Sequence, residues 1–323
     1  MPPWTPVARR RLWLAVQALF IGAGAWYAAT AVAGQWSAVR AQLAGTSPRW
    51  GLVAAATVLV LTTYLLLVEV WRVVLGAWGG RLAFRDAAHV WFVSNLGKYV
   101  PGKIWQIAAL SAMAQRRGLS AVAATGAALL VNLANVVSGA VLVLAAGAPG
   151  LAGGTGRGRL AAAALALLVL LVGAPLALPF IGARLGRFIG RPLDWPRLPA
   201  RALVVATGGT AAAWILYGIA FRLFGGAILP EAPGSAGAWV AVYTGSYLAG
   251  YLTPAAPGGI VIREVVLVRG MVALGLATEP GAWLVALASR LWLTVLEIAP
   301  AAISLAAAAG RAPGRRASQG EQS

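Results

Sequence analysis

Residues 119–145 read LSAVAATGAALLVNLANVVSGAVLVLA, and no charged residue occurs between Arg117 and Arg157. A helix needs roughly 20 consecutive apolar residues to cross the hydrocarbon core of a bilayer, and this interval is longer. A second uncharged interval runs from Arg11 to Arg40. Intervals of this length predict helices that span a membrane rather than helices buried in a soluble core.

The composition of the whole chain agrees with this interpretation. Of 323 residues, 60% are hydrophobic and only 11% are charged, whereas soluble domains carry about 25% charged residues. The apolar runs predict six full spans, near residues 12–33, 50–71, 119–145, 160–182, 202–224 and 282–306. We therefore expect an all-α, polytopic integral membrane protein. The chain has no cysteine, which excludes disulfides and thiolate metal sites.

Two further apolar stretches, residues 87–114 and 238–276, are interrupted by proline and glycine. The predicted structural breaks are Pro101, Gly102, Pro254, Pro257, Gly258 and Gly259. Proline removes a backbone donor and clashes with the preceding turn, so neither stretch is expected to be one continuous helix. We predict two re-entrant hairpins, each made of two half-helices. The alternative is that each stretch is a pair of ordinary spans, which would give about eight to ten membrane helices.

Spans and hairpins follow the same order twice, in repeat halves at about residues 12–146 and 159–306. Because the second half starts from the opposite side of the membrane, the order predicts an inverted-topology repeat. In transporters with such repeats, paired Gly/Pro-interrupted segments form the binding site. Outside this membrane domain, residues 1–11 are predicted to be a cytoplasmic N-terminus and residues 307–323 a disordered cytoplasmic tail.

Basic residues are distributed unequally between the two predicted sides. Sixteen arginines fall on the side of the N-terminus, and four (Arg40, Arg49, Arg157 and Arg159) fall on the other. The positive-inside rule then predicts a multi-pass protein of the bacterial cytoplasmic (inner) membrane with both termini in the cytoplasm. The net charge of +18 is explained by topology and anionic lipids rather than by nucleic acid. A cleavable signal peptide is the alternative for the first span, because residues 31–33 resemble a cleavage site.

The first break, residues 95–106, reads NLGKYVPGKIWQ and contains both lysines of the chain, Lys98 and Lys103. Lysine acts as a point charge toward phosphate, and free N–H groups at a half-helix start favour the same ligand. We predict binding of an anionic headgroup, with candidate residues Asn95, Lys98, Tyr99, Lys103 and Gln106. The alternative is that the lysines only extend to the membrane interface. Residues 97–103 also match most of a P-loop, but Ile104 replaces the hydroxyl residue that binds Mg²⁺, so no nucleotide site is expected.

The second break ends in adjacent opposite charges, Arg263 and Glu264. Charged residues at membrane depth are costly unless they are paired or face a polar cavity, so both are candidate substrate-binding residues. In the last span, Arg290 and Glu297 lie on one helical face with Thr294, and both are also candidate substrate-binding residues. They need not contact each other and can reach partners such as Glu264. The alternative is a buried ion pair that only fixes helix packing.

Three smaller features complete the list of polar residues in the spans. Glu69 and Arg72 are three residues apart and predict a local ion pair. Asn132 and Asn135 predict interhelical hydrogen bonds. His89 is the only histidine, so no metal site is expected, and no motif of a catalytic site is present.

The two breaks together resemble the transmembrane region of lysylphosphatidylglycerol synthases, also called the flippase-like family. The resemblance rests on residues 95–106, on PGGIVIRE at residues 257–264 and on the span that contains Arg290, and it covers roughly residues 10–306. One departure is Val261, where the family pattern P-G-G-x-G-x-R-E has glycine. This substitution implies a stiffer second turn.

In full-length synthases this region precedes a soluble aminoacyl-transferase domain and is held to move the aminoacylated lipid across the bilayer. The chain ends at Ser323, so the resemblance implies the translocating region without the synthesising domain. Our leading hypothesis is a lipid translocase for an anionic or aminoacylated phospholipid or a polyprenyl-phosphate lipid. It is expected to be no enzyme, to need no cofactor, and to have membrane lipids and a lipid-modifying enzyme as candidate partners.

Two alternatives remain open at this point. One is a membrane-embedded transferase that acts on a lipid-linked substrate, with Glu264 or Glu297 as base. The other is an accessory or scaffold subunit of a lipid-modifying system. The transferase would need a carboxylate with a raised pKa beside a donor pocket, and the scaffold would need a stoichiometric partner.

Overall fold

The computed structural model describes residues 47–99, 105–151, 199–229, 231, 233–253 and 259–309, with isolated positions at 37, 162, 166, 169, 173, 184 and 187. Every regular element in these ranges is helical, which confirms the all-α prediction. The eight α-helices are α3 (Trp50–Gly76), α4 (Phe84–Asn95), α5 (Trp105–Gln115), α6 (Ala121–Leu151), α8 (Ala200–Ile228), α9 (Ala236–Leu252), α10 (Ile262–Ala273) and α11 (Glu279–Ala309). A 3₁₀-helix, η1 (Leu96–Tyr99), continues from α4.

Four of these helices, α3, α6, α8 and α11, are long and apolar enough to cross a membrane. They confirm the spans predicted near residues 50–71, 119–145, 202–224 and 282–306. Their apolar lengths of 26 to 30 residues correspond to about 39 Å or more, which exceeds the roughly 30 Å of a hydrocarbon core. Helix α11 ends at Ala309, so it includes the first residues of the segment assigned to the tail. The spans predicted at 12–33 and 160–182 lie outside the described residues.

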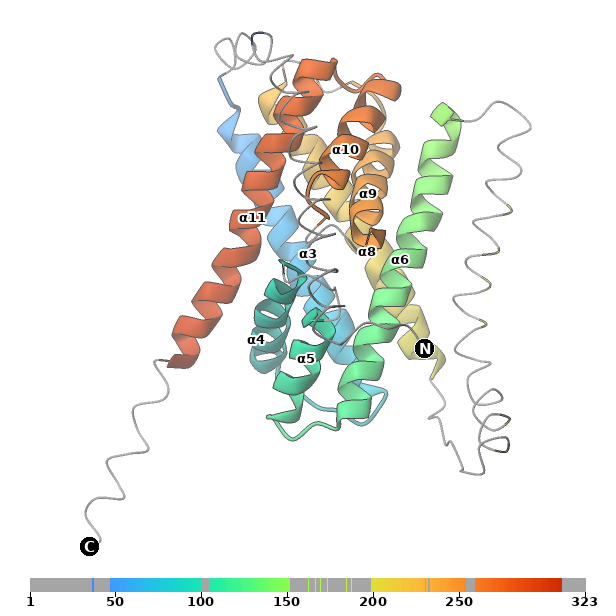
Figure 1. The fold of residues 1–323 in the computed structure, drawn as a ribbon, viewed down its shortest axis with the longest axis vertical. Coiled ribbons are helices and arrows are strands. Elements are labelled where there is room, and N and C mark those ends of the chain that lie inside the picture. The colour runs from blue at the N-terminus through green and yellow to red at the C-terminus, as the bar shows by residue number, and fades with distance from the viewer. Residues whose placement is uncertain are drawn as a thin grey trace, which may run out of the picture.

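The two interrupted stretches form separate helical hairpins. Helix α4 packs against α5, and α9 packs against α10. Figure 1 shows the long helices running along the molecule, with α4 and α5 in its lower half and α9 and α10 in its upper half. Helices α4, α5 and α10 have 12, 11 and 12 residues, or about 18 Å each. Each hairpin therefore occupies only part of the length of the bundle.

The long helices α3 and α8 pack along each other and join the two halves. Where α3 begins, the backbone N–H of Arg49 donates to the carbonyl of Ala227 at 3.0 Å, and Nη2 of Arg49 donates to the carbonyl of Leu229 at 3.1 Å. The opposite end, around α4 and α5, carries Arg81 in the loop before α4, Arg85 in the first turn of α4, and Arg116 and Arg117 in the turn after α5. The predicted grouping of arginines at one end is present, and the assignment of that end to the cytoplasm stays a prediction.

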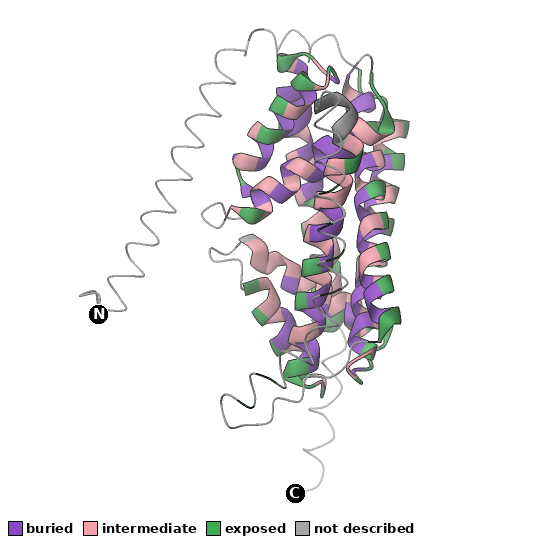
Figure 2. Cartoon of the chain, turned by 90° about the vertical axis from the view of Figure 1, so that its right-hand side faces the viewer, coloured by how far each residue is buried: buried purple, intermediate pink, exposed green. Residues whose placement is uncertain are grey.

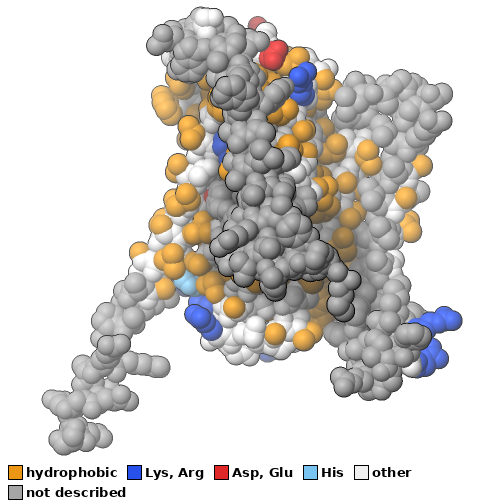
Figure 3. Space-filling view, viewed as in Figure 1, with side chains coloured by type: hydrophobic (Ala, Val, Ile, Leu, Met, Phe, Trp, Pro, Cys, Tyr) orange, Lys and Arg blue, Asp and Glu red, His pale blue; other side chains and the backbone are white. Residues whose placement is uncertain are grey.

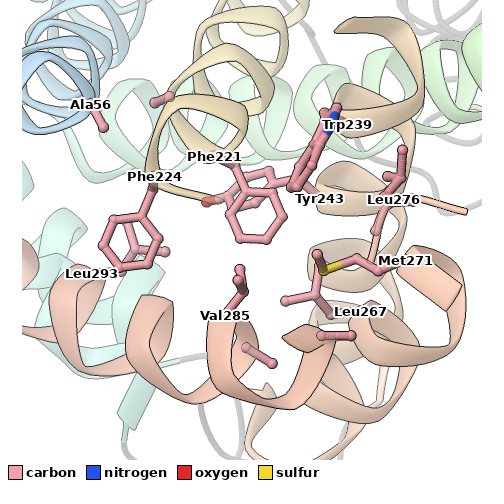
Figure 4. Packing of buried hydrophobic residues seen from close by; sticks show 14 of the residues in the cluster. Ala56, Phe221, Phe224, Trp239, Tyr243, Leu267, Met271, Leu276, Val285 and Leu293 are labelled. Atoms are coloured by element: carbon pink, nitrogen blue, oxygen red, sulfur yellow. The ribbon is translucent and has the colours of Figure 1, made fainter. Parts of the chain in front are cut away.

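Each hairpin is held in its own hydrophobic cluster. Around α9 and α10, Phe221, Trp239 and Tyr243 point toward one another while Met271 and Val285 close the cluster from α10 and α11 (Figure 4). Around α4 and α5, the second cluster is formed mainly by α3, α4 and α6. Figure 2 shows the buried residues along the inner faces of the helices. The half-helices on either side of each break are thus packed into the interior of the bundle.

Exposed large apolar side chains lie on the outer faces of the long helices. The most exposed of these are Trp50, Val122, Val204, Leu291 and Ile303. The visible described surface in Figure 3 is mostly hydrophobic between its ends. A contiguous apolar surface of this kind needs a lipid environment rather than water.

Close contact between α8 and α9 depends on Gly218. A Cβ atom added there would lie 2.5 Å from the Cα of Val240, so the two helix backbones would have to separate. On the same helix, Gly208 has no atom within 4 Å of the corresponding position. Small residues allow this kind of close helix packing in membranes.

We predict that Gly218→Ala lowers the stability of the bundle by about 1–3 kcal/mol, the usual cost of overpacking. The matched control Gly208→Ala is expected to be neutral or to stabilise the helix by up to about 1 kcal/mol. Thermal unfolding in detergent micelles measures both. Equal unfolding temperatures for the two variants would contradict the packing described here.

Candidate functional site

The first hairpin is tied to α11 by an ion pair. Lys98, at the end of η1, lies with its Nζ 2.6 Å from Oε1 of Glu297. The two side chains are only 18% and 12% exposed. The ammonium group of Lys98 therefore lies inside the bundle against a carboxylate. The alternative that the two lysines only extend to the membrane interface stays a prediction.

The second hairpin is tied to the same helix. Nη1 of Arg290 lies 3.5 Å from Oε1 of Glu264, which confirms the predicted pairing. The other carboxylate oxygen of Glu264 accepts a hydrogen bond from the backbone N–H of Val261 at 2.7 Å. Glu264 therefore caps α10 and pairs with α11 at once, while no ion pair between Glu264 and its neighbour Arg263 is present.

Arg263 is directed elsewhere. Its guanidinium lies over the rings of Tyr243 and Tyr247, 5.4 Å and 5.7 Å from their centroids, and the residue is 6% exposed. Tyrosine faces attract a cation. Its Nη2 atom is nevertheless buried without a hydrogen-bond partner among the described residues. A buried donor without a partner is costly, and in a native structure it points to water or a ligand at that position.

A cavity of about 50 Å³, called here the cationic chamber, is lined by all of these charged groups except Glu264. Its walls are Lys98, Gln106, Tyr247, Gly250, Tyr251, Gly259, Arg263, Arg290, Leu293, Thr294 and Glu297. The predicted stripe on α11 is confirmed, since Arg290, Thr294 and Glu297 all face this chamber. At roughly 10–15 Å³ per water in this measure, the chamber holds only a few water molecules.

A second cavity of about 100 Å³, the aromatic chamber, adjoins the first and shares walls with it, including Lys98 and Glu297. Its further lining consists of aromatic rings and amides: Tyr64, Trp91, Trp214, Tyr217, Tyr243, Asn95, Asn132 and Asn135. The pair between Lys98 and Glu297 stands at the boundary between the chambers.

Amide groups connect the helices around the aromatic chamber. Nε2 of Gln106 donates to Oδ1 of Asn95 at 2.9 Å, which joins α5 to α4 across the first break. The hydroxyl of Tyr251 donates to Oδ1 of Asn132 at 3.0 Å. The carbonyl of Asn135 accepts from Nε1 of Trp214 at 2.8 Å. The interhelical hydrogen bond predicted for the side chain of Asn132 is thus confirmed, whereas Asn135 joins the helices through its backbone carbonyl and not through its amide.

The turn into α10 has strained backbone at the position where the family pattern has glycine. Val261 has φ of 74°, a conformation that costs a β-branched residue roughly 1–3 kcal/mol. The hydrogen bond from its N–H to Glu264 holds it there. Gly259, with φ of 68°, lies against Gly250 of α9, where a Cβ atom added to Gly259 would be 3.0 Å from the Cα of Gly250.

Several predicted site residues lie outside the described residues. They are Lys103, Pro101, Gly102, Pro254, Pro257 and Gly258. The backbone of Tyr99 is described as part of η1, but its side chain is not. The roles assigned to these residues stay predictions.

The sequence interpretation missed the tyrosines. Five of the seven tyrosines in the chain line the two chambers: Tyr64, Tyr217, Tyr243, Tyr247 and Tyr251. The last three are spaced four residues apart on α9, which places them on one helical face. That spacing could have predicted from the sequence that these three tyrosines share a site. No sequence pattern indicated that Tyr64 of α3 and Tyr217 of α8 would join them.

The remaining polar predictions concern residues away from the chambers. Glu69 and Arg72 form the predicted local pair at 2.6 Å. Nδ1 of His89 lies 2.6 Å from Oγ of Ser304. In the part of the chain that the structure describes, no group of three metal-ligating side chains occurs.

These features define a multi-pass helical membrane protein with a buried, charged cavity where two helical hairpins meet one long helix. The chain belongs to the lysylphosphatidylglycerol synthase TM region family, whose model matches residues 14–300. This confirms the resemblance drawn from the two breaks. No curated protein matches the sequence.

We predict that Lys98→Met lowers stability by about 3 kcal/mol, because it leaves the carboxylate of Glu297 buried and unpaired. Glu69→Gln is the control, since its pair with Arg72 is exposed and worth about 0–1 kcal/mol. Thermal unfolding in micelles of Lys98→Met, Glu297→Gln and the double variant measures the coupling. Additive losses would show that the two groups do not stabilise each other.

We also predict that Gly259→Ala is more damaging than Gly275→Ala. Both positions have positive φ, 68° and 64°, so each substitution costs about 1–2 kcal/mol in backbone strain. Only Gly259 also contacts another backbone, which adds about 1–3 kcal/mol. A larger fall in unfolding temperature for Gly259→Ala is expected, and equal falls would argue against the contact with Gly250.

Proposed function

We propose that this protein is a lipid translocase. It would move an anionic or aminoacylated phospholipid, or a polyprenyl-phosphate lipid, between the leaflets of the bacterial cytoplasmic membrane. The observation that supports this most directly is Arg263, a buried cation with an unpartnered donor at a cavity inside the membrane domain. Charged residues placed at such a depth mark substrate pathways in membrane proteins.

The charge of the site suits a phosphodiester. The walls of the cationic chamber contribute three cations (Lys98, Arg263 and Arg290) and one carboxylate (Glu297). Glu264 lies outside the lining but is paired with Arg290, which brings the net charge of these five groups to +1. A phosphodiester carries one negative charge and would neutralise the site. A planar guanidinium is well suited to bind two phosphate oxygens. Lys103 is proposed to add to this attraction.

The aromatic chamber would take the part of the headgroup beyond the phosphate. Its tyrosine faces attract cationic groups, and Glu297 provides a carboxylate at its boundary. An amine of an aminoacylated headgroup would fit this environment. The amides of Asn95, Asn132 and Gln106 can donate and accept hydrogen bonds, so they also suit the hydroxyls of a glycerol headgroup.

We propose that the two hairpins are re-entrant, enter from opposite faces, and belong to an inverted-topology repeat. Each hairpin is tied to α11 by one ion pair, Lys98 with Glu297 and Arg290 with Glu264. A bound phosphate would compete with Glu297 for Lys98, or with Glu264 for Arg290. It would therefore weaken one of the two ion pairs at a time. Rocking of one half against the other would then expose the cationic chamber to alternate sides.

The mechanism proposed here contains no covalent step and no cofactor. The lipid that leaves is chemically identical to the lipid that enters. The arginine-rich end around α4 and α5 would face the cytoplasm, with both termini on that side. A lipid-modifying enzyme is the proposed partner.

The direct test is exchange of labelled phosphatidylglycerol between the leaflets of proteoliposomes. We expect Arg263→Gln to slow exchange at least about tenfold, since losing a buried charge-assisted contact costs roughly 1.5–3 kcal/mol. Arg263→Lys is expected to be intermediate, because the charge stays but the paired donors are lost. Arg72→Gln, an arginine outside the chambers, is the control and should exchange like the wild type.

Two results would contradict the proposal. One is an unchanged rate in Arg263→Gln together with unchanged rates in Lys103→Ala and Glu264→Ala. The other is a chemically altered lipid after incubation with the purified protein, since this would favour a transferase. Exchange that appears only with a stoichiometric partner would favour an accessory role.

A further inference from the structure

A separate groove of about 480 Å³ lies between α3, α4 and α11, near the arginine-rich end. Apolar side chains form much of its wall, among them Leu61 and Leu65 of α3, Phe92 of α4 and Ile303 of α11. Leu65 and Ile303 are 47% and 69% exposed. In a membrane these side chains face lipid. The volume falls in the range of pockets that bind small molecules, about 300–1,000 Å³.

One end of the groove carries basic side chains. Arg85, His89 and Arg117 line it there, with Asp86 as the single carboxylate. Asp86 is paired with Nε of Arg117 at 3.4 Å. Arg85 has no carboxylate partner among the described residues. The groove is therefore apolar along its length and cationic at the end that lies toward the basic loops.

The shape of α11 creates this groove. Pro300 lies inside α11 and lacks the N–H that continues the helical ladder. Beyond the middle of the bundle, α11 slants away from α4 (Figure 1). A hydrogen bond between His89 and Ser304, 2.6 Å apart, still joins the two helices there. The space between them is the groove.

We infer that this groove binds one anionic phospholipid of the leaflet at the basic end. An acyl chain would lie along Leu61, Leu65 and Ile303, and the phosphate would contact Arg85 and Arg117. The apolar wall of the groove matches the acyl chain of a lipid, and the cationic end matches its anionic headgroup. Basic residues at a membrane surface favour anionic over zwitterionic lipids.

The groove is also next to the chambers. On α4, Trp91 lines the aromatic chamber and Phe92 lines the groove. On α11, Glu297 lines both chambers and Ser304 lines the groove. Because Trp91 and Phe92 are consecutive residues, the groove and the aromatic chamber lie on neighbouring faces of α4. The groove is thus the entry site of the translocated lipid, and this role rests on the proposed function. The binding of a lipid in the groove does not depend on the proposed function.

The test is lipid retention by the full chain in detergent, measured by native mass spectrometry. The purified protein is titrated with phosphatidylglycerol and, separately, with phosphatidylcholine. We expect one phosphatidylglycerol to be retained in preference, and Arg85→Gln to weaken this retention about fivefold, the effect of one basic residue near a membrane surface. Arg81→Gln and Arg116→Gln are matched controls, because these arginines lie at the same end but not in the groove.

A second variant fills the apolar part. Leu65→Trp is expected to reduce retention of both lipids without lowering the unfolding temperature. Equal loss of phosphatidylglycerol in Arg85→Gln, Arg81→Gln and Arg116→Gln would overturn the inference, and so would a dimer whose cross-links join Phe84 and Ile303 of two copies. Selective retention of phosphatidylglycerol by a protein that does not exchange lipid between leaflets would support lipid binding in the groove. The same result would contradict the proposed translocation.

Discussion

The arrangement depends on the cost of placing charges inside a membrane domain. Lys98, Glu264 and Glu297 have low exposure, and an ionised group moved into a low-dielectric interior needs a close partner of opposite charge. Helix α11 provides these partners for both hairpins, through Glu297 for the first and Arg290 for the second. The positions of the hairpins relative to one another follow from this shared helix.

The same constraint explains the local backbone at the breaks. Glu264 must point toward Arg290 while it caps α10, and this holds Val261 in a positive-φ conformation. The close approach of Gly259 to Gly250 lets the turn lie against α9. The half-helices beside each break pack in a hydrophobic cluster of their own. Strain at Val261 is tolerated because the surrounding contacts fix that position.

Paired charges alone would be compatible with a purely structural role. The feature that goes beyond packing is the mismatch between cations and anions at the cationic chamber. Arg263 is stabilised by tyrosine faces instead of a carboxylate, and one of its donors has no partner among the described residues. A site optimised only for stability would pair or remove that group. This mismatch is the physical basis of the proposed phosphate binding, and the groove between α4 and α11 offers a lipid a place beside it.

The sequence by itself determined the membrane class, the four described spans, the two interrupted stretches, the pair of Glu69 and Arg72, and the common face of Arg290 and Glu297. These features are local, because apolar run length, proline breaks and the helical repeat are fixed by neighbouring residues. Only the tertiary structure decided that Lys98 pairs with Glu297, that Arg263 lies over Tyr243 and Tyr247, and that aromatic side chains from several helices enclose one chamber. Such contacts join residues far apart in the chain, and their partners are selected by how the helices pack, which no local pattern encodes.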